Sequence, residues 1–334
     1  MKSDLLQFTN KGIYCPPAKV YLDPWRGVEK ALITHAHSDH ARFGSNAYLS
    51  HKDSEAILRL RLNKNLPLQT VSYNESVDIN GVKFSFHPAG HIVGSSQIRV
   101  EYKGEVWVFS GDYKLENDGF SVPFEPVKCD VFITECTFGL PVYRWKPQQE
   151  IFDSIHHWWK SNAAQGICSV LIGYSLGKAQ RLLVNLDASI GPIYAHTAIQ
   201  NTHDALITAG FNLPATLRVD VKAPKSEYRN ALILAPPATS DSAWMKRFEP
   251  YSIAVASGWM EIRGARRRSN VDRGFALSDH ADWPSLVKAV KESGASRIIA
   301  THGYSASFSR WLNEQGYEAQ DAKTEYSTET PEPE

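Results

Sequence analysis

Residues 35–40 carry the side chains most suited to chemistry: His35, His37, Asp39 and His40. They directly follow residues 31–34, whose composition predicts a buried strand that ends in a polar loop. Imidazole and carboxylate groups bind zinc, manganese and iron, and four of them in so short a loop can serve two ions. A solvated histidine-rich loop is the alternative, but histidine-rich tracts are more typical of metal binding. The segment therefore predicts a metal site.

Three more candidate ligands, His91, Asp112 and His302, each follow a run of alternating or apolar residues that predicts a strand. Those runs cover residues 82–86, 106–109 and 297–301. Strand ends are where a rigid scaffold usually places its functional side chains. Any one of these residues alone would more often be an ordinary turn residue. Together they favour a shared site with the histidine-rich loop.

The order of these motifs resembles the metallo-β-lactamase fold. HxHxDH stands at residues 35–40, and Gly-His, Gly-Asp and His-Gly follow at 90–91, 111–112 and 302–303. Asp23, at the end of an earlier predicted strand, matches an aspartate that supports the histidine loop in this fold without binding a metal. The resemblance implies an α/β fold built on an αββα sandwich.

More narrowly, the chain is similar to the β-CASP nucleases of that fold. Their additional motifs are matched by Glu135, His280 and His302, and residues 174–181 are similar to the segment that opens the inserted β-CASP domain. The resemblance covers residues 12–318, which is nearly the whole chain. In its compact length and in the residues of its motifs, the chain most resembles the bacterial exonucleases associated with DNA ligases. These are relatives of Artemis, RNase J and the cleavage-and-polyadenylation endonuclease.

The resemblance implies two divalent transition metals as cofactors, zinc and/or manganese, which would activate water for attack on phosphorus. The implied ligands of the first ion are His35, His37 and His91. Those of the second ion are Asp39, His40 and His302, with Asp112 bridging both ions and so counted among the catalytic residues.

His280 and Glu135 are implied in the reaction without being ligands. His280 would contact the scissile phosphate or protonate the leaving oxygen, and Glu135 would fix the orientation of His280. The alternative for Glu135 is a surface carboxylate at a strand end.

The implied function is metal-dependent phosphodiester hydrolysis by a DNA exonuclease in DNA repair, in functional association with a DNA ligase and a helicase. RNA processing by an endo- or exoribonuclease of the same family is the alternative, because His302 matches the branch richer in RNA enzymes. A thioesterase or lactonase of this fold would share the ligands but leave the inserted domain and His280 unexplained. A non-catalytic binding subunit would be expected to lack ligands that this chain retains.

Composition agrees with a globular enzyme: the chain has 334 residues, 43% hydrophobic content and a net charge of +0. The N-terminal residues include no sustained apolar segment, so neither a signal peptide nor a membrane span is expected. The four cysteines lie far apart without a CxxC pair, which predicts reduced thiols in a cytoplasmic protein.

A neutral net charge does not by itself indicate a nucleic-acid enzyme, but residues 261–273 hold five arginines against two acidic residues. Since this segment precedes His280, we expect Arg266, Arg267 and Arg268 to contact backbone phosphates. Lys178, in the segment that resembles the start of the β-CASP domain, is a further candidate. The alternative to phosphate binding is that the arginines form an ordinary solvent-exposed face.

The chain reads as a discontinuous arrangement of two domains. Residues 1–144 and 271–322 would form the metallo-β-lactamase domain, and residues 145–270 the β-CASP domain. Within the insertion the patterns predict helices at residues 151–159 and 178–186 and buried strands at 169–173 and 231–235. Residues 323–334 are acidic and contain prolines, which predicts a disordered tail.

Overall fold

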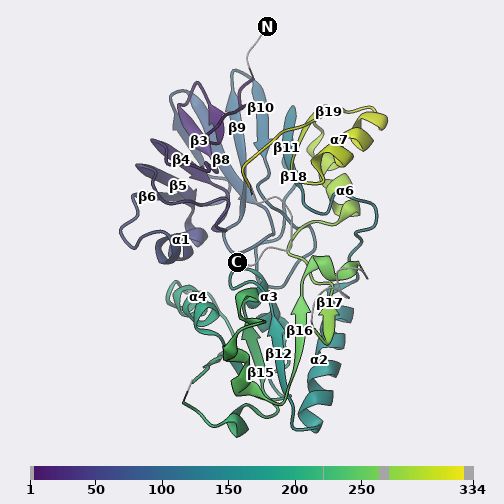
Figure 1. Ribbon diagram of the computed structural model, residues 1–334. Coiled ribbons are helices and arrows are strands. Elements are labelled where there is room, and N and C mark those ends of the chain that lie inside the picture. The colour runs from purple at the N-terminus through teal and green to yellow at the C-terminus, as the bar shows by residue number, and fades with distance from the viewer. Residues whose placement is uncertain (1–3, 221, 263–270, 327–334) are drawn as a thin grey trace. The chain divides into compact units, whose positions relative to one another are not determined.

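The computed structural model describes residues 4–220, 222–262 and 271–326, and it divides the chain into two compact units (Figure 1). The first unit contains the chain up to Arg144 and again from His280, and the second contains Trp145–Asp279. Each unit is a mixture of helices and strands, so the α/β class predicted from the sequence is confirmed.

The first sheet of unit 1 has six strands in the order β1-β2-β3-β4-β5-β6. They are β1 (Gln7–Phe8), β2 (Ile13–Cys15), β3 (Val20–Leu22), β4 (Lys30–Ile33), β5 (Ala47–His51) and β6 (Leu68–Val71). β1, β2 and β3 pair antiparallel, whereas β3 to β6 pair in parallel. The 3₁₀ helix η1 (Lys52–Ser54) and the helix α1 (Glu55–Arg61) connect β5 to β6. The loops after β3 and β4 therefore emerge from neighbouring strands that run in the same direction.

The second sheet of unit 1 has seven strands in the order β19-β18-β11-β10-β9-β8-β7. They are β7 (Ser76–Ile79), β8 (Val82–Pro88), β9 (Ser96–Tyr102), β10 (Glu105–Phe109), β11 (Val131–Cys136), β18 (Arg297–Gly303) and β19 (Glu318–Asp321). β11 pairs in parallel with β18, and Glu135 lies opposite Thr301 in that register. β18, which follows the inserted segment in the sequence, is thus hydrogen-bonded directly to β11, which precedes it.

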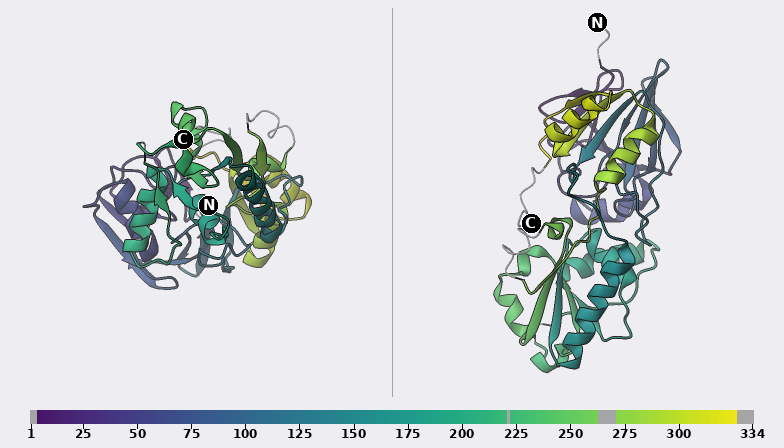
Figure 2. Two further views of the ribbon diagram at one scale, coloured as in Figure 1. Left: turned by 90° about the horizontal axis from the view of Figure 1, so that it is seen from below. Right: turned by 90° about the vertical axis from the view of Figure 1, so that its right-hand side faces the viewer.

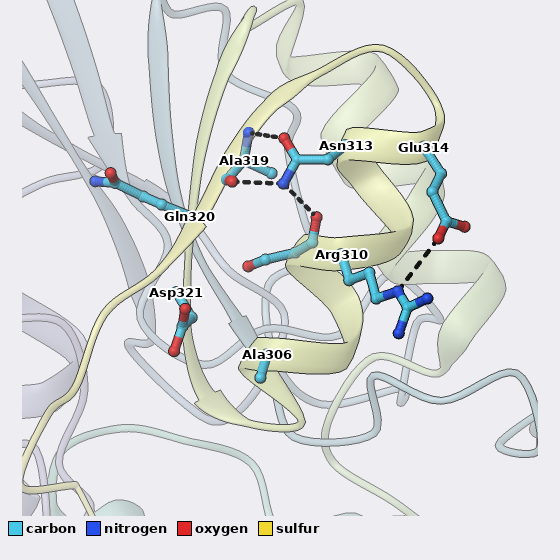
Figure 3. Close-up of a pocket in the computed structure, with 8 residues that line it drawn as sticks. Ala306, Arg310, Asn313, Glu314, Ala319, Gln320 and Asp321 are labelled. Carbon is cyan, nitrogen blue, oxygen red and sulfur yellow. Dashed lines mark hydrogen bonds and ion pairs between the residues drawn. The ribbon is translucent and has the colours of Figure 1, made fainter.

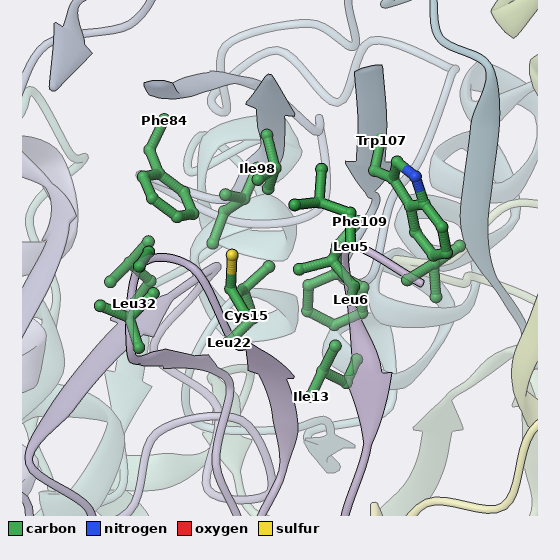
Figure 4. Close-up of a cluster of buried hydrophobic side chains, with 14 of the residues drawn as sticks. Leu5, Leu6, Ile13, Cys15, Leu22, Leu32, Phe84, Ile98, Trp107 and Phe109 are labelled. Carbon is green, nitrogen blue, oxygen red and sulfur yellow. The ribbon is translucent and has the colours of Figure 1, made fainter. Parts of the chain in front are cut away.

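The two sheets of unit 1 face each other across an apolar layer. Leu22 and Leu32 from the first sheet share a buried cluster with Phe84 and Trp107 from the second (Figure 4). Side chains alternate between the faces of a strand, so Val108 of β10 points the other way. It belongs to a second cluster, which includes residues of the helices α6 (Trp283–Ser293) and α7 (Ser305–Glu314). Unit 1 is therefore layered as sheet, sheet and helices.

Unit 2 contains a third sheet of six parallel strands in the order β14-β13-β15-β12-β16-β17. They are β12 (Cys168–Ile172), β13 (Ile193–Ala195), β14 (Leu217–Arg218), β15 (Leu232–Ala235), β16 (Tyr251–Ala256) and β17 (Arg273–Phe275). Every residue of β12 is buried, as expected for a central strand covered on both faces.

The helices of unit 2 are α2 (Gln148–Ala164), α3 (Lys178–Asn185) and α4 (Thr197–Thr208). Short 3₁₀ helices lie at η2 (Lys225–Tyr228), η3 (Pro237–Thr239), η4 (Ala243–Phe248) and η5 (Gly258–Glu261). Figure 2 shows α2 running along the strands of this unit. Its Trp158 and Trp159 are buried and donate their ring N–H groups to Ser252 and to the carbonyl oxygen of Asn230. The two tryptophans therefore pack in the core of unit 2.

The strands and helices predicted from periodicity are confirmed, but unit 2 ends later than the expected domain boundary. β17 pairs in parallel with β16, so the third sheet extends past residue 271, where the sequence places the return to the first domain. The short Arg273–Phe275 strand contains a glycine and gave no clear strand signal. Unit 2 runs to Asp279.

The predicted disordered tail is wrong for its first residues. Tyr326 has only 3% of its surface exposed and packs in the cluster between the two sheets. Burial of one aromatic side chain can stabilise an ordered position for a polar segment. The average composition of the segment, which is acidic, does not reveal this contribution. Residues 327–334 lie outside the described part of the chain. Every helix in the described ranges is too short or too polar to span a bilayer.

Candidate metal centre

The candidate ligands gather at the ends of strands from both sheets of unit 1. Asp23 directly follows β3, and His35 comes two residues after the end of β4. His91, Asp112 and His302 come from the β8–β9 loop, the residues after β10 and the end of β18. The facing sheets thus bring side chains that are far apart in the sequence to one edge of unit 1.

Four residues form the first group: His35, His37, His91 and Asp112. One possible ligand atom from each lies within 4.8 Å of those from the others. The distance from His91 Nε2 to His37 Nδ1 is 3.0 Å, and that from His35 Nε2 to Asp112 Oδ2 is 3.4 Å. This spacing places three imidazoles and one carboxylate around a common point.

Asp39, His40 and His302 form a second group with the same spacing limit of 4.8 Å. His40 Nε2 lies 3.7 Å from Asp39 Oδ2 and 3.4 Å from Asp112 Oδ2. Because the same Asp112 oxygen is 3.4 Å from His35 Nε2, this carboxylate lies between the two groups. The residues that the sequence assigns to two ions are thus brought together as two adjacent groups.

Buried polar atoms without hydrogen-bond partners indicate that these groups suit metal ions. They are His35 Nε2, His40 Nε2, Asp112 Oδ1 and His302 Nδ1. Buried polar atoms normally find a partner, so four orphans at one place require an explanation, and a cation would supply it. The set of imidazole and carboxylate ligands is one that zinc or manganese accepts.

The pKa shifts of His35 and Asp112 suit metal ligands, whereas, despite burial, Asp112 and Asp39 raise the pKa of His40 well above its usual value. Burial and the neighbouring His40 hold the pKa of His35 well below its usual value, which leaves a neutral imidazole. Burial alone would raise the pKa of Asp112, but His40 and His302 hold it well below its usual value. A neutral imidazole and an ionised carboxylate are the forms that bind a metal.

Asp23 supports His40 and the start of the histidine loop. Its Oδ2 lies 2.7 Å from His40 Nδ1, so a proton on Nδ1 leaves Nε2 of His40 available as a ligand atom. The Thr34 backbone N–H donates to Oδ1 at 2.7 Å, and the Thr34 hydroxyl donates to Oδ2 at 2.5 Å. Asp23 also lies close enough to His35 and His40 to form a ligand group, but these bonds occupy both its oxygens.

Glu135 and His280 form a pair beside the ligand groups. His280 Nδ1 lies 3.0 Å from Oε2 and 3.1 Å from Oε1 of Glu135. Glu135 is buried and also accepts from the Tyr113 backbone N–H at 2.7 Å and from the Thr137 hydroxyl at 2.5 Å. The His280 ring lies 4.6 Å from the His91 ring, centroid to centroid. The imidazole is therefore oriented by a fixed carboxylate next to the first ligand group.

Two glycines in the predicted motifs are required by the backbone of the site. Gly90 has φ +74°, and a Cβ there would lie 2.2 Å from the Lys114 carbonyl oxygen. Gly111 has φ +55°, and a Cβ there would lie 2.7 Å from the Thr34 hydroxyl, which supports Asp23. Only glycine combines a left-handed conformation with such close approach, so these residues allow His91 and Asp112 to reach the centre.

Sequence reasoning missed Thr34, Thr137 and Tyr326. Thr34 directly precedes the histidine loop, and Thr137 comes two residues after Glu135, so a hydroxyl beside a predicted site residue was the available signal. Tyr326 stacks on His40, with ring centroids 4.5 Å apart and planes 10° apart. The only signal for it was a tyrosine within an otherwise acidic segment.

The predicted phosphate contacts are Lys178 and the run of three arginines. Lys178 is buried, and its ammonium donates to the Leu277 carbonyl oxygen and pairs with Asp279 at 2.9 Å. That Lys178 binds nucleic acid therefore stays a prediction, and in the structure its charge is paired within unit 2. Arg266, Arg267 and Arg268 lie outside the described residues.

A pocket in unit 1 lies apart from the ligand residues. It is lined by α7 and β19 (Figure 3), and its side chains largely pair with one another. Arg310 donates to Glu314 at 3.3 Å, and Asn313 bonds the backbone of Ala319. None of its lining residues belongs to the ligand groups.

Comparison with known proteins finds no matching family model. The chain is 30% identical over 311 residues to a protein named Probable DNA ligase from Opitutus terrae, a match that covers 92% of this chain and 30% of that protein. It is 34% identical over 170 residues to Endoribonuclease YSH1 from Yarrowia lipolytica, which covers 49% of this chain and 19% of the relative.

A third relative is Cleavage and polyadenylation specificity factor subunit 3-I from Arabidopsis thaliana. It is 28% identical over 205 residues, which cover 50% of this chain and 28% of the relative. The chain thus spans less than a third of the length of these curated relatives.

A solved structure of a protein of unknown function from Enterococcus faecalis V583 matches with a TM-score of 0.62 and 12% identity. The match covers 89% of this chain and 79% of that one, and at this identity it concerns the fold alone.

Proposed function

The chain belongs to the β-CASP nuclease family, and we propose that it is a metal-dependent phosphodiesterase that acts as a DNA exonuclease in DNA repair. In this proposal unit 1 is the metallo-β-lactamase domain, an αββα sandwich, and unit 2 is the inserted β-CASP domain. The two facing sheets of unit 1 and the interruption of that unit by Trp145–Asp279 support this assignment.

The observation that carries the proposal is the position of Asp112. Its Oδ2 is 3.4 Å from an imidazole nitrogen of each ligand group, His35 in the first and His40 in the second. A carboxylate between two sets of imidazoles and acidic groups is suited to two adjacent cations, the arrangement used by many phosphodiesterases. A thioesterase or lactonase would not need the paired His280 and Glu135 beside it.

We assign His35, His37, His91 and Asp112 to one divalent ion, and Asp39, His40, His302 and Asp112 to the other. Zinc or manganese bound there would supply Lewis acidity, which lowers the pKa of water and offsets negative charge on the phosphoryl oxygens. Asp23 would keep the Nε2 atom of His40 directed to this centre through its bond to Nδ1.

His280 would handle the proton of the leaving group. Its Nδ1 lies 3.0 Å from Glu135 Oε2, so the Nδ1–H donates to the carboxylate and Nε2 is the atom that would act on the substrate. A protonated Nε2 would donate to the leaving oxygen or hold the scissile phosphate. Glu135 would not touch the substrate, because Tyr113, Thr137 and His280 already occupy its carboxylate.

DNA is the preferred substrate because the match to the protein named Probable DNA ligase extends over 92% of this chain. RNA is the second candidate, since the relatives named as endoribonuclease and polyadenylation factor match about half of it. We also propose a functional association with a DNA ligase and a helicase. The ligase-named relative supports the first partner, and co-elution of the chain with a purified DNA ligase would test it.

We propose a cytoplasmic location because the cysteines, all of which the structure describes, form no disulfide.

The test is digestion of 5′- and 3′-end-labelled single- and double-stranded DNA and RNA with Zn²⁺ or Mn²⁺ present. Products that shorten stepwise from one end of DNA support the proposal, and Asp112→Ala serves as the control for a contaminating nuclease. Cleavage of RNA alone would transfer the assignment to RNA processing. Turnover of a thioester with neither nucleic acid cleaved would overturn the nuclease function.

A further inference from the structure

The segment that follows β19 returns to the histidine loop of unit 1. It leaves the sheet after Asp321, where the Ala322 N–H still donates to the Ala300 carbonyl oxygen at 2.9 Å. Five residues after β19, Tyr326 is 3% exposed. A short polar segment therefore ends in a buried aromatic side chain next to the candidate metal ligands.

The Tyr326 ring lies almost parallel to the ring of His40. The two centroids are 4.5 Å apart and the planes differ by 10°, whereas the contact with His302 is tilted by 34° at 5.9 Å. Two ligands of the second group, His40 and His302, are thus in contact with one tyrosine.

Several polar contacts hold Tyr326 in this place. Its hydroxyl donates to the Asp23 carbonyl oxygen at 3.2 Å, and its ring meets Trp25 edge to face at 5.5 Å. The preceding Glu325 pairs with Arg26 at 2.7 Å and accepts from Arg42 through its carbonyl oxygen at 3.3 Å. Both arginines and Trp25 lie in the stretch of chain that contains Asp23 and the histidine loop, so the segment is tied to that stretch at several points.

We infer that Tyr326 is a positioning residue of the metal centre, which fixes the imidazole plane of His40 and thereby retains the second ion. This inference rests on the proposed two-metal function. The Asp23 carboxylate holds His40 through Nδ1, and this single hydrogen bond leaves the ring some freedom to tilt about the side-chain torsions χ1 and χ2. An aromatic ring stacked on the imidazole opposes this rotation.

The hydroxyl of Tyr326 contributes separately from the ring. Its bond goes to the backbone of Asp23, whose carboxylate supports His40, so it links the stacking residue to the hydrogen-bonding residue. Tyr326→Phe keeps the stacking surface and removes only this bond. Tyr326→Ala removes both.

The experiment compares wild type, Tyr326→Phe, Tyr326→Ala and Tyr14→Ala for metal content and for the rate of zinc loss to a chelator. Tyr14 is a matched control, because it contacts Tyr21 at 4.6 Å in unit 1 and is outside the ligand groups. We expect Tyr326→Ala to bind the second zinc ion roughly 10–100-fold more weakly, the usual effect of losing a partner of a metal-bound histidine. The first ion should be retained, and Tyr326→Phe should lie closer to wild type.

The outcomes separate this inference from the proposed function. Fewer than two metals in the wild type would contradict the two-metal centre itself. Two metals in the wild type with unchanged zinc loss in Tyr326→Ala, or the same loss in Tyr14→Ala, would overturn the role of Tyr326. Faster phosphodiester hydrolysis by Tyr326→Ala with unchanged zinc retention would also overturn it, because the segment would then act by limiting access to the centre. If Tyr326→Ala does not fold, Tyr326→Leu provides the same comparison with apolar volume retained.

Discussion

His280 Nδ1 lies 3.0 Å from Glu135 Oε2, although 145 residues separate the two in the sequence. Glu135 is part of a strand in the middle of the second sheet, whereas His280 is the first residue of the chain's return to unit 1. The carboxylate is fixed by three other bonds, to Tyr113 and to the backbone and side chain of Thr137. The histidine is thus oriented by a group that cannot itself move.

We predict that His280→Ala retains both metals and still binds nucleic acid, while turnover falls by roughly 10²–10⁴, the usual range for a lost general acid or base. Glu135→Gln should lower turnover less, because the imidazole remains. The double variant should be barely worse than His280→Ala, since the carboxylate acts through the histidine. Effects that multiply independently, or a fall in metal content, would mean that the pair is misassigned.

A second prediction concerns metal content. The purified wild type should contain two transition metals per chain, and Asp39→Ala should lower the occupancy of the second site more than the first. Asp112→Ala should weaken both, because its Oδ2 is 3.4 Å from His35 Nε2 and from His40 Nε2. Elemental analysis checks this directly, and one ion or fewer in the metal-replete wild type would count against the binuclear centre.

The stability of unit 2 should depend on pH through His203. Burial lowers the pKa of His203 from 6.5 to about 4, so the unfolded chain takes up this proton more readily than the folded one. Its contribution to the free energy of unfolding is present above pH 6.5 and is lost as the pH falls towards 4, on the order of 3 kcal/mol in total. Denaturant unfolding across this range checks the sign. In His203→Gln the acid-induced loss should be smaller, and an equal loss would exclude His203 as its source.

A further prediction concerns the arginine run, which lies outside the described residues. Replacing Arg266, Arg267 and Arg268 together by Ala should weaken nucleic-acid binding without changing metal content. On single strands the slope of log K against log salt should fall by about 0.7 for each lost phosphate contact. A slope equal to that of wild type would mean that these residues form a solvent-exposed face and contact no phosphate.

Much of the architecture could be predicted because strand signals are local. The alternation of residues 82–86 and the apolar runs before Asp112 and His302 predicted β8, β10 and β18. The candidate ligands were also predictable, since each stands at a strand end. The ion pair of Lys178 could not be predicted, because its partners, Leu277 and Asp279, are about a hundred residues away and no local pattern indicates such a pair. Tyr326 was missed for a related reason, because its role depends on stacking with His40, which is distant in the sequence.

The pairing of β11 with β18 also determines when the centre can form. During synthesis the whole of Trp145–Asp279 is made before Arg297–Gly303, so unit 2 can fold while the seven-stranded sheet still lacks a strand beside β11. His302 lies within this late strand. A nascent chain that ends before β18 would carry Asp39 and His40 without His302, so its second ligand group would be incomplete.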